Sequence, residues 1–216
     1  MRRLLAAGVL LSYNTWVLAP LLWGGDVPPG YLSELAADDQ PWQWVFRGGD
    51  LLAGALLLAI AALGVRGWRA RLGDWSAAVS LALAASGVGT VADALGNMPC
   101  APTTDAMCRD TATVSGVVHV IASGTVGAGF LMVLGLLVLG LRDRGAPRAQ
   151  VRAVLVAAGA LGAVDVLTLV VAALAPGSQV WPQVGQVLLS SLLAAALTLG
   201  LERGADGGAR LPARTC

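Results

Sequence analysis

Four ionisable residues fall inside apolar stretches of the sequence: Asp50, Asp93, His119 and Asp165. A charged side chain in the hydrocarbon of a bilayer costs about 2.5 to 3.5 kcal/mol on insertion scales, so such residues seldom face lipid. A histidine near a carboxylate titrates close to neutral pH and can relay a proton, and the same groups can hold a polar headgroup. These four residues are therefore candidates for binding a ligand or a proton.

The composition of the 216-residue chain places these residues in a membrane. It is 56% hydrophobic and only 12% charged, its mean hydropathy is +0.73, and its apolar residues occur in runs long enough to cross a bilayer. We predict an integral membrane protein of the all-α class. Membrane lipids are its expected partners, a nucleic-acid partner is not expected, and the sequence names no protein partner.

Six apolar stretches are predicted to be transmembrane helices, each with roughly 20 residues at a rise of about 1.5 Å per residue. They run approximately over residues 4–23, 44–65, 75–95, 113–141, 153–175 and 184–201. The fourth is longer than a bilayer requires, so we expect it to tilt or to extend beyond the membrane. Together they predict a single six-helix transmembrane domain, followed by a short cytoplasmic tail over residues 202–216.

The arginines determine the predicted orientation. All 14 basic residues are Arg, and 12 of them fall in segments on the same side as the N-terminus, leaving Arg47 and Arg109 on the other side. Because short cytoplasmic loops carry an excess of Arg, both termini are predicted to face the cytoplasm. Six of the seven tryptophans lie at predicted span ends, as residues of the membrane interface often do: Trp23, Trp42, Trp44, Trp68, Trp75 and Trp181.

The first span has two interpretations. Its basic start and apolar run resemble a signal peptide, whose cleavage would leave five helices. The run continues to Trp23 without a small-residue cleavage site, which favours an uncleaved helix.

The predicted topology brings Asp50, Asp93 and His119 to a similar depth in the outer third of the bilayer, with Asp165 nearer the middle. Helical stripes of small and polar residues are expected to face the interior of the bundle, where they allow close helix packing. The stripes are Ala82, Ser86, Thr90, Asp93 and Asn97 on the third span, Ser115, His119, Ser123 and Gly127 on the fourth, Ala158, Gly162, Asp165 and Thr168 on the fifth, and Gln183, Gln186, Ser190 and Ala194 on the sixth.

This outer cluster has a functional and a structural interpretation. In the functional one, its groups form a polar pocket that opens to the outer surface and binds a lipid or small molecule, with transport of that ligand or of a proton as an extension. In the structural one, Asp93 pairs with His119 and Asp50 pairs with Arg47, and these pairs fix the helix register of a structural or accessory membrane subunit. The sequence leaves both open, with the binding protein as the first hypothesis.

An intramembrane hydrolase is the third hypothesis. Zinc hydrolases of the ceramidase and progestin-receptor-like type use a Ser, an Asp and three His, and this chain has a single His. Asp93 and His119 could act as an acid and a base, with Ser115 one turn earlier as the nucleophile. No nucleophile motif surrounds Ser115, so we predict no catalytic residue and no cofactor. Ser115 is kept as a further candidate for binding a ligand or a proton.

The first external segment, YLSELAADDQPWQWVF over residues 31–46, is acidic and aromatic. Ser33 is expected to cap a short turn that places Glu34 in its first positions. The segment is either a hydrated loop with an interfacial aromatic belt or a lid over the outer mouth of the bundle. Glu34 is therefore a further candidate for ligand binding.

The second external segment carries Cys100 and Cys108. Two cysteines at this spacing on the predicted oxidising side are expected to form a disulfide. No His and no further Cys lies in the external loops to complete a zinc site, so a metal site is the weaker interpretation and none is predicted. Cys216, in the predicted cytoplasmic tail, is expected to be a free thiol.

Several features of the sequence resemble the bacterial membrane family DUF998 over nearly the entire chain. They are PGYLSELAADDQPWQWVF before the second span, Asp93 with GNMPCAP after the third, Cys108, and His119 early in the fourth. The Ser-Glu-Leu segment with its following aromatics is also similar, over a short stretch, to a loop of the Frag1/DRAM/Sfk1-like six-helix proteins. The resemblance to DUF998 implies a six-helix fold in a bacterial plasma membrane and implies no established reaction.

Overall fold

The structure is a computed structural model that describes residues 1–25, 28–108 and 113–201. Its elements, in chain order, are α1 (Arg2–Tyr13), the 3-10 helix η1 (Thr15–Leu18), α2 (Ala19–Leu22), the 3-10 helix η2 (Leu32–Ala36), α3 (Gln43–Gly67), α4 (Arg69–Leu72), α5 (Trp75–Leu95), α6 (Val114–Asp143), α7 (Arg148–Leu174) and α8 (Val180–Leu199). These described residues contain no strand, which confirms the predicted all-α class.

Five helices are long and apolar enough to cross a membrane: α3, α5, α6, α7 and α8. They correspond to the second to sixth predicted spans. Helix α5 has the predicted bounds, whereas α7 begins at Arg148 rather than at residue 153, because the arginine-rich turn after Pro147 is already helical. These long apolar helices indicate a membrane-embedded protein.

The first predicted span is not one continuous helix. Helix α1 ends at Tyr13, and the chain bends by 55° before η1 and α2 continue to Leu22. The bend lies at Asn14, whose Nδ2 donates to the carbonyl of Leu10 at 2.7 Å. In a continuous helix this carbonyl would accept the backbone N–H of Asn14, which bonds instead to Leu11 at 3.4 Å. The asparagine side chain thus competes with the backbone and ends α1.

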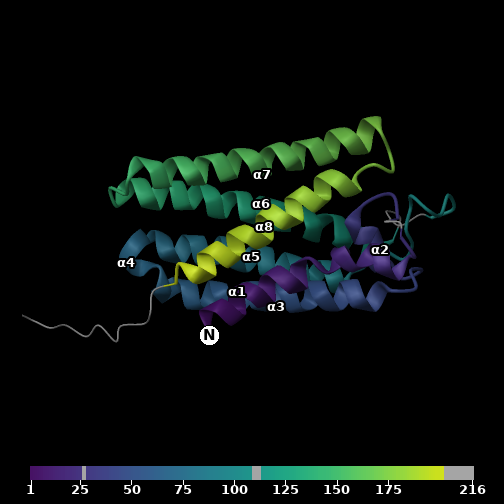
Figure 1. The fold of residues 1–216 in the computed structure, drawn as a ribbon, viewed down its shortest axis with the longest axis horizontal. Coiled ribbons are helices and arrows are strands. Elements are labelled where there is room, and N and C mark those ends of the chain that lie inside the picture. Colours follow the sequence, from purple (N-terminus) through teal and green to yellow (C-terminus); the bar gives the residue numbers. More distant parts are fainter. Residues whose placement is uncertain (26–27, 109–112, 202–216) are drawn as a thin grey trace, which may run out of the picture.

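The long helices run along the longest axis of the molecule, and α8 crosses the others diagonally (Figure 1). Helix α5 packs between α3 and α6, while α1 packs against α3 and α8. Helix α7 packs mainly against α6 and α8 and is the least buried of the five long helices. Most of its apolar surface therefore faces outward.

Small residues let α5 approach its neighbours closely. A Cβ atom added to Gly54 of α3 would lie 3.0 Å from the carbonyl oxygen of Gly87 on α5. One added to Gly89 would lie 3.0 Å from the carbonyl oxygen of Ala122 on α6. The predicted stripe is accordingly buried at Ala82, Ser86 and Thr90 of α5 and at Asn97, just after the helix ends.

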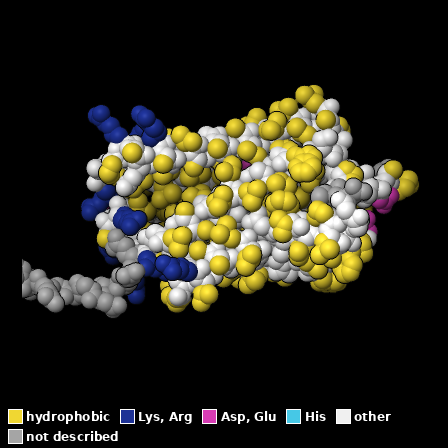
Figure 2. All heavy atoms as spheres, viewed as in Figure 1, with side chains coloured by type: hydrophobic (Ala, Val, Ile, Leu, Met, Phe, Trp, Pro, Cys, Tyr) yellow, Lys and Arg dark blue, Asp and Glu magenta, His cyan; other side chains and the backbone are white. Residues whose placement is uncertain are grey.

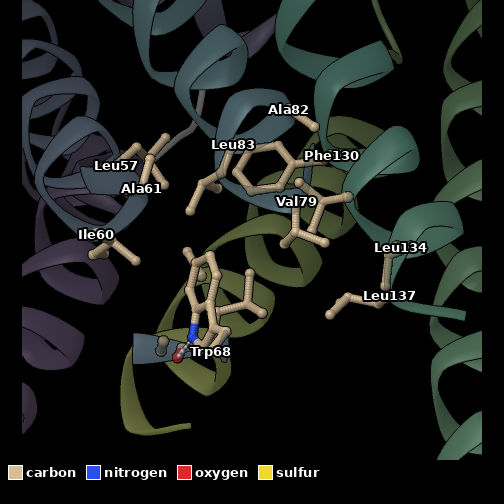
Figure 3. Close-up of a cluster of buried hydrophobic side chains, with 14 of the residues drawn as sticks. Leu57, Ile60, Ala61, Trp68, Val79, Ala82, Leu83, Phe130, Leu134 and Leu137 are labelled. Atoms are coloured by element: carbon tan, nitrogen blue, oxygen red, sulfur yellow. Dashed lines mark hydrogen bonds between the residues drawn. The ribbon is translucent and has the colours of Figure 1, made fainter. Parts of the chain in front are cut away.

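The apolar core surrounds Phe130 and includes side chains from α1 and from all five long helices, and part of it is drawn in Figure 3. Trp68 belongs to this core: it is only 3% exposed, and its Nε1 donates to the carbonyl of Leu197 at 3.1 Å. The predicted interface position is therefore wrong for Trp68, since the turn after α3 folds the ring back under the bundle. Trp44 and Trp181, by contrast, are exposed at helix ends.

The two ends of the bundle differ in charge. We call one the arginine end, because arginine side chains gather there, at the left of Figure 2. They come from Arg2, Arg3, Arg66, Arg69, Arg71, Arg142, Arg144, Arg148 and Arg152. We call the opposite end the disulfide end, and it carries η2 and the segment that joins α5 to α6. Arg109, Cys216 and the predicted tail lie outside the described residues.

Candidate ligand-binding site

A cavity of about 120 Å³ lies among α1, α3, α5, α6 and α8 towards the disulfide end, and η2 forms part of its wall. Its polar lining consists of hydroxyl, amide and carboxylate side chains, and these include Asp50, Asp93, Ser123, Gln183, Gln186 and Ser190. None of the described residues that line it is basic. The cavity wall is therefore acidic.

Asp93 joins α5 to α6 through two side chains that lie one helical turn apart. Its Oδ1 accepts a hydrogen bond from Ser123 Oγ at 2.7 Å and lies 3.0 Å from Nδ1 of His119. The second contact has the distance of an ion pair but not the direction of a hydrogen bond. His119 is buried behind Asp93, outside the cavity lining. The structure thus contains the predicted pairing of Asp93 with His119.

The order of these three side chains differs from that of a serine hydrolase. In a Ser-His-Asp triad the histidine touches the serine and removes its proton. Here the carboxylate of Asp93 lies between Ser123 and His119, and the serine donates to the carboxylate. The arrangement is suited to holding two helices together and to binding a proton or a cation, and it does not activate Ser123 as a nucleophile.

Asp50 reaches the same cavity from α3 without a partner. Its carboxylate makes no hydrogen bond or ion pair with any residue in the described part of the chain. The predicted pairing of Asp50 with Arg47 is wrong, because the largely buried Arg47 side chain has other partners. Its Nη1 lies 2.8 Å from Asp38 Oδ1, and its guanidinium stacks on Trp44. An unpaired carboxylate at this depth needs water, a proton or a ligand.

The break in the first span lines the other side of the cavity with Tyr13, Thr15 and Trp16. Asn14 holds the break in place, since its Nδ2 donates to Ser191 Oγ of α8 at 2.9 Å and its Oδ1 accepts from Trp16 Nε1 at 3.0 Å. Interrupted helices of this kind line many ligand sites in membrane proteins. The sequence analysis missed this element, although an asparagine inside an apolar span was a visible signal.

Helix α8 contributes Gln183, Gln186 and Ser190 to the cavity. The predicted stripe on the sixth span contains all three residues, but they were not among the candidates for binding. Gln183 also reaches the first loop, where its Oε1 accepts the backbone N–H of Leu32. The amides thus offer donors and acceptors beside the two carboxylates.

Glu34 is buried in the loops rather than in the cavity. Its carboxylate accepts from the backbone N–H of Tyr31 at 3.0 Å, and from both the backbone N–H (3.0 Å) and the hydroxyl (2.7 Å) of Thr103. Tyr31, not Ser33 as predicted, is the N-cap of η2, and Ser33 lines the cavity. Burial and the nearby Glu34 carboxylate raise the pKa of Tyr31.

Further hydrogen bonds join the segments at the disulfide end into one cap. Asp39 Oδ2 accepts the backbone N–H of Ala101 at 3.2 Å, and Asn97 Nδ2 donates to the carbonyl of Ala36. The segment between α7 and α8 joins the cap through Gly177, whose carbonyl accepts the N–H of Gly30 at 2.9 Å. The first loop therefore packs as an ordered wall above the cavity.

The family model described as "Protein of unknown function (DUF998)" matches residues 6–201, which include every residue of the cavity and of the cap. The chain belongs to the DUF998 family. This finding confirms the longer of the two resemblances seen in the sequence. No curated protein and no solved structure is significantly similar to this DUF998 protein.

Two other candidates of this DUF998 protein lie outside the cavity lining. Ser115 is in the first turn of α6, where its Oγ lies 3.2 Å from Thr113 Oγ1. Asp165 of α7 is half-buried, and its Oδ1 has no hydrogen-bond partner among the described residues. A Cβ added to Gly127 would lie 3.5 Å from Gln186 Nε2 and 4.0 Å from Asp165 Oδ2, so Asp165 approaches the cavity amide across this glycine.

Cys100 and Cys108 form a disulfide, with their Cα atoms 5.8 Å apart, as the sequence predicted. It closes the segment that contains Thr103, the partner of Glu34. In the described part of the DUF998 chain, no group of three or more His, Cys, Asp or Glu side chains is placed to hold a metal ion.

Proposed function

We propose that this DUF998 protein is a non-enzymatic integral membrane protein that binds a small molecule or lipid headgroup in its cavity through a positively charged amine. The observation that carries the proposal is Asp50, a carboxylate that enters the cavity and has no protein partner in the described residues. A protonated amine would satisfy it, because a charge-assisted hydrogen bond is about twice as strong as a neutral one.

The sign of the charge on the wall supports an amine over a phosphate. Asp50 and Asp93 both line the cavity, and none of the described lining residues is basic. The nearby amides and hydroxyls of Gln183, Gln186 and Ser190 can bind polar groups beside the amine. The volume of about 120 Å³ limits the bound group to a small headgroup or molecule.

Proton movement is the second part of the proposal. Asp50 and Asp93 line the cavity, and His119 contacts Asp93 from behind. A series of carboxylate and imidazole groups can accept a proton in place of the amine, so that binding and protonation compete. The interrupted first span supports a role in transport, because such helices form the sites of many transporters.

We further propose that the cavity opens to the outside of a bacterial plasma membrane. The gathering of arginines at the opposite end supports cytoplasmic termini under the positive-inside rule. In this arrangement α1 and the α2 segment together form a sixth, bent span. The disulfide would then lie on the oxidising side, where such bonds persist.

A structural or accessory subunit is the second candidate function. The contacts of Asp93 with both Ser123 and His119 favour it, because they hold α5 against α6. In that case the polar groups would fix helix register and the cavity would hold only water.

Ligand titration of the purified full chain in neutral detergent tests the proposal. The probes are ethanolamine, short-chain phosphatidylethanolamine and, as an anionic control, glycerol phosphate. Trp16 lines the cavity, so binding should change a fluorescence signal that Trp16→Phe removes. We expect saturable binding of the two amines. Tighter binding of the lipid than of ethanolamine would identify a headgroup as the ligand, and equal affinities would identify the free amine.

Asp50→Asn is the decisive variant, and Asp143→Asn is its matched control, since Asp143 is exposed at the arginine end and lies outside the cavity lining. A hydrogen bond to a charged group contributes about 1.5 to 3 kcal/mol, so Asp50→Asn should weaken amine binding by roughly 10-fold to 100-fold. The control should bind as the parent does. Binding of glycerol phosphate in preference to both amines, or equal binding by the parent and Asp50→Asn, would reject the proposal.

A further inference from the structure

A second hollow lies at the arginine end, where α6 turns into α7. It has a volume of about 380 Å³ and is lined by Arg142, Ala146, Arg148, Val151, Arg152 and Leu155. We call it the α6–α7 groove. Its lining contains three cationic side chains, and no described acidic residue is among them. The groove therefore combines three positive charges with an apolar surface.

The three arginines of the groove have no partner in the described residues. Arg142, Arg148 and Arg152 are exposed and take part in no hydrogen bond or ion pair there. The nearest carboxylate in the sequence, that of Asp143, is also exposed and pairs with none of them. Their charges are therefore available to a ligand.

The floor of the groove and the surface of α7 beyond it are apolar. Val151 is buried beneath the arginines, and Leu155, one turn further along α7, is 45% exposed. Exposed apolar side chains continue along the same helix: Val156, Val166, Leu167, Leu169 and Val170. A ligand that satisfies both parts needs an anionic head and a long apolar tail.

We propose that the α6–α7 groove binds an anionic phospholipid, with its phosphate between the guanidinium groups and its acyl chains along α7. Arginine presents planar donors that match the oxygens of a phosphate. Arg148 and Arg152 lie four residues apart on one face of α7, and Arg142 approaches from α6. Basic pockets between membrane helices are known to hold lipid headgroups in this way.

The groove goes beyond the proposed amine site and does not depend on it. The two sites lie at opposite ends of the bundle and carry opposite charge. Lipid binding here would fix α7, which otherwise packs mainly against α6 and α8. The side chains of the groove therefore suit a lipid that holds α7 against the rest of the bundle.

Lipid titration followed by native mass spectrometry tests this inference. The full chain in neutral detergent is titrated with phosphatidylglycerol, cardiolipin or zwitterionic phosphatidylcholine, and bound lipid is counted. The groove variant is Arg148→Gln/Arg152→Gln. The matched control is Arg66→Gln/Arg144→Gln, which removes the same charge from exposed arginines of the same end that do not line the groove.

We expect the parent and the control variant to retain one tightly bound anionic lipid, and phosphatidylcholine to bind far less. Each surface arginine contributes about fivefold to affinity for anionic lipid, so the groove variant should lose roughly 30-fold. A second variant, Arg148→Lys/Arg152→Lys, keeps the charge and should lie between the parent and the groove variant. If the Gln variant folds poorly, the Lys variant takes its place in the comparison with the parent.

Three results would overturn the inference. Equal losses in the groove and control variants would mean that the charge of the whole end attracts lipid, without a site. Equal binding of phosphatidylcholine would remove the role of the phosphate charge. Displacement of the bound lipid by millimolar inorganic phosphate would identify the groove as a site for the free anion.

Discussion

Asp93 Oδ1 on α5 lies 3.0 Å from His119 Nδ1 on α6, and the same oxygen accepts the hydroxyl of Ser123 one turn further along α6. The two helices are antiparallel neighbours in the chain, so this contact fixes their relative height near the disulfide end. The same carboxylate lines the cavity. One residue therefore connects helix packing with the candidate site.

Asp93→Asn and His119→Gln should each lower the free energy of unfolding by about 1 kcal/mol, because polar contacts between membrane helices contribute about 0.6 to 1.7 kcal/mol. The double variant should lose little more than either single one, since both remove the same contact. Equilibrium unfolding in mixed detergent micelles measures these values. Asp143→Asn is the control, because this carboxylate is exposed and has no partner among the described residues. Additive losses in the double variant would show that the two residues do not act as a pair.

Much of the fold follows from the sequence, because the bilayer restricts the choice of structure. A run of about 20 apolar residues in lipid must satisfy its backbone internally and therefore forms a helix. This reasoning placed α5 at its observed bounds and located Cys100 and Cys108 in one loop. Helical spacing also identified the contact of Asp93 with His119, since both lie on interior stripes near the same end.

The structure differs from the sequence-based predictions at side chains that can bond to more than one nearby group. Asn14 was overlooked because one amide hardly alters the hydropathy of a long apolar run, yet its side chain takes a backbone carbonyl and breaks the helix. Arg47 was assigned to Asp50 from a spacing of three residues, but the folded loop offers it Asp38 instead. Such choices depend on loop geometry that apolar periodicity does not contain. Glu34 likewise takes its partner from a loop, where the Thr103 hydroxyl donates to it.

Gly54→Ala should destabilise the bundle, and Gly48→Ala on the same helix should not. A methyl group at Gly54 would lie 3.0 Å from both the Gly87 carbonyl oxygen and the Val91 nitrogen, whereas nothing lies within 4 Å of one at Gly48. Because backbone atoms cannot move aside, overpacking there should cost about 1 to 3 kcal/mol. Thermal unfolding in detergent compares the two. Equal stability of both variants would show that α3 and α5 pack less closely than these distances require.

The disulfide should stabilise the cap more than the bundle. In Cys100→Ser/Cys108→Ser, the amides of Ala101 and Thr103 should exchange hydrogen faster, because the loop that presents them to Asp39 and Glu34 is no longer closed. A loop of this size contributes on the order of 2 to 3 kcal/mol. Hydrogen exchange with mass spectrometry measures the protection of these amides. Protection in α5 should stay unchanged. Cys216→Ser is the control, and unchanged exchange in the cap would contradict the prediction.

The proposed orientation predicts which single cysteines a membrane-impermeant maleimide can reach. Ser178 is exposed in the segment between α7 and α8 at the disulfide end, and Gln150 is exposed in the first turn of α7 at the arginine end. In a Cys216→Ser background with the disulfide intact, Ser178→Cys should be labelled in intact spheroplasts. Gln150→Cys should be labelled only after the membrane is opened, because short loops that are rich in arginine stay in the cytoplasm. The reverse pattern would place the cavity on the inner side and would refute the outward-facing site.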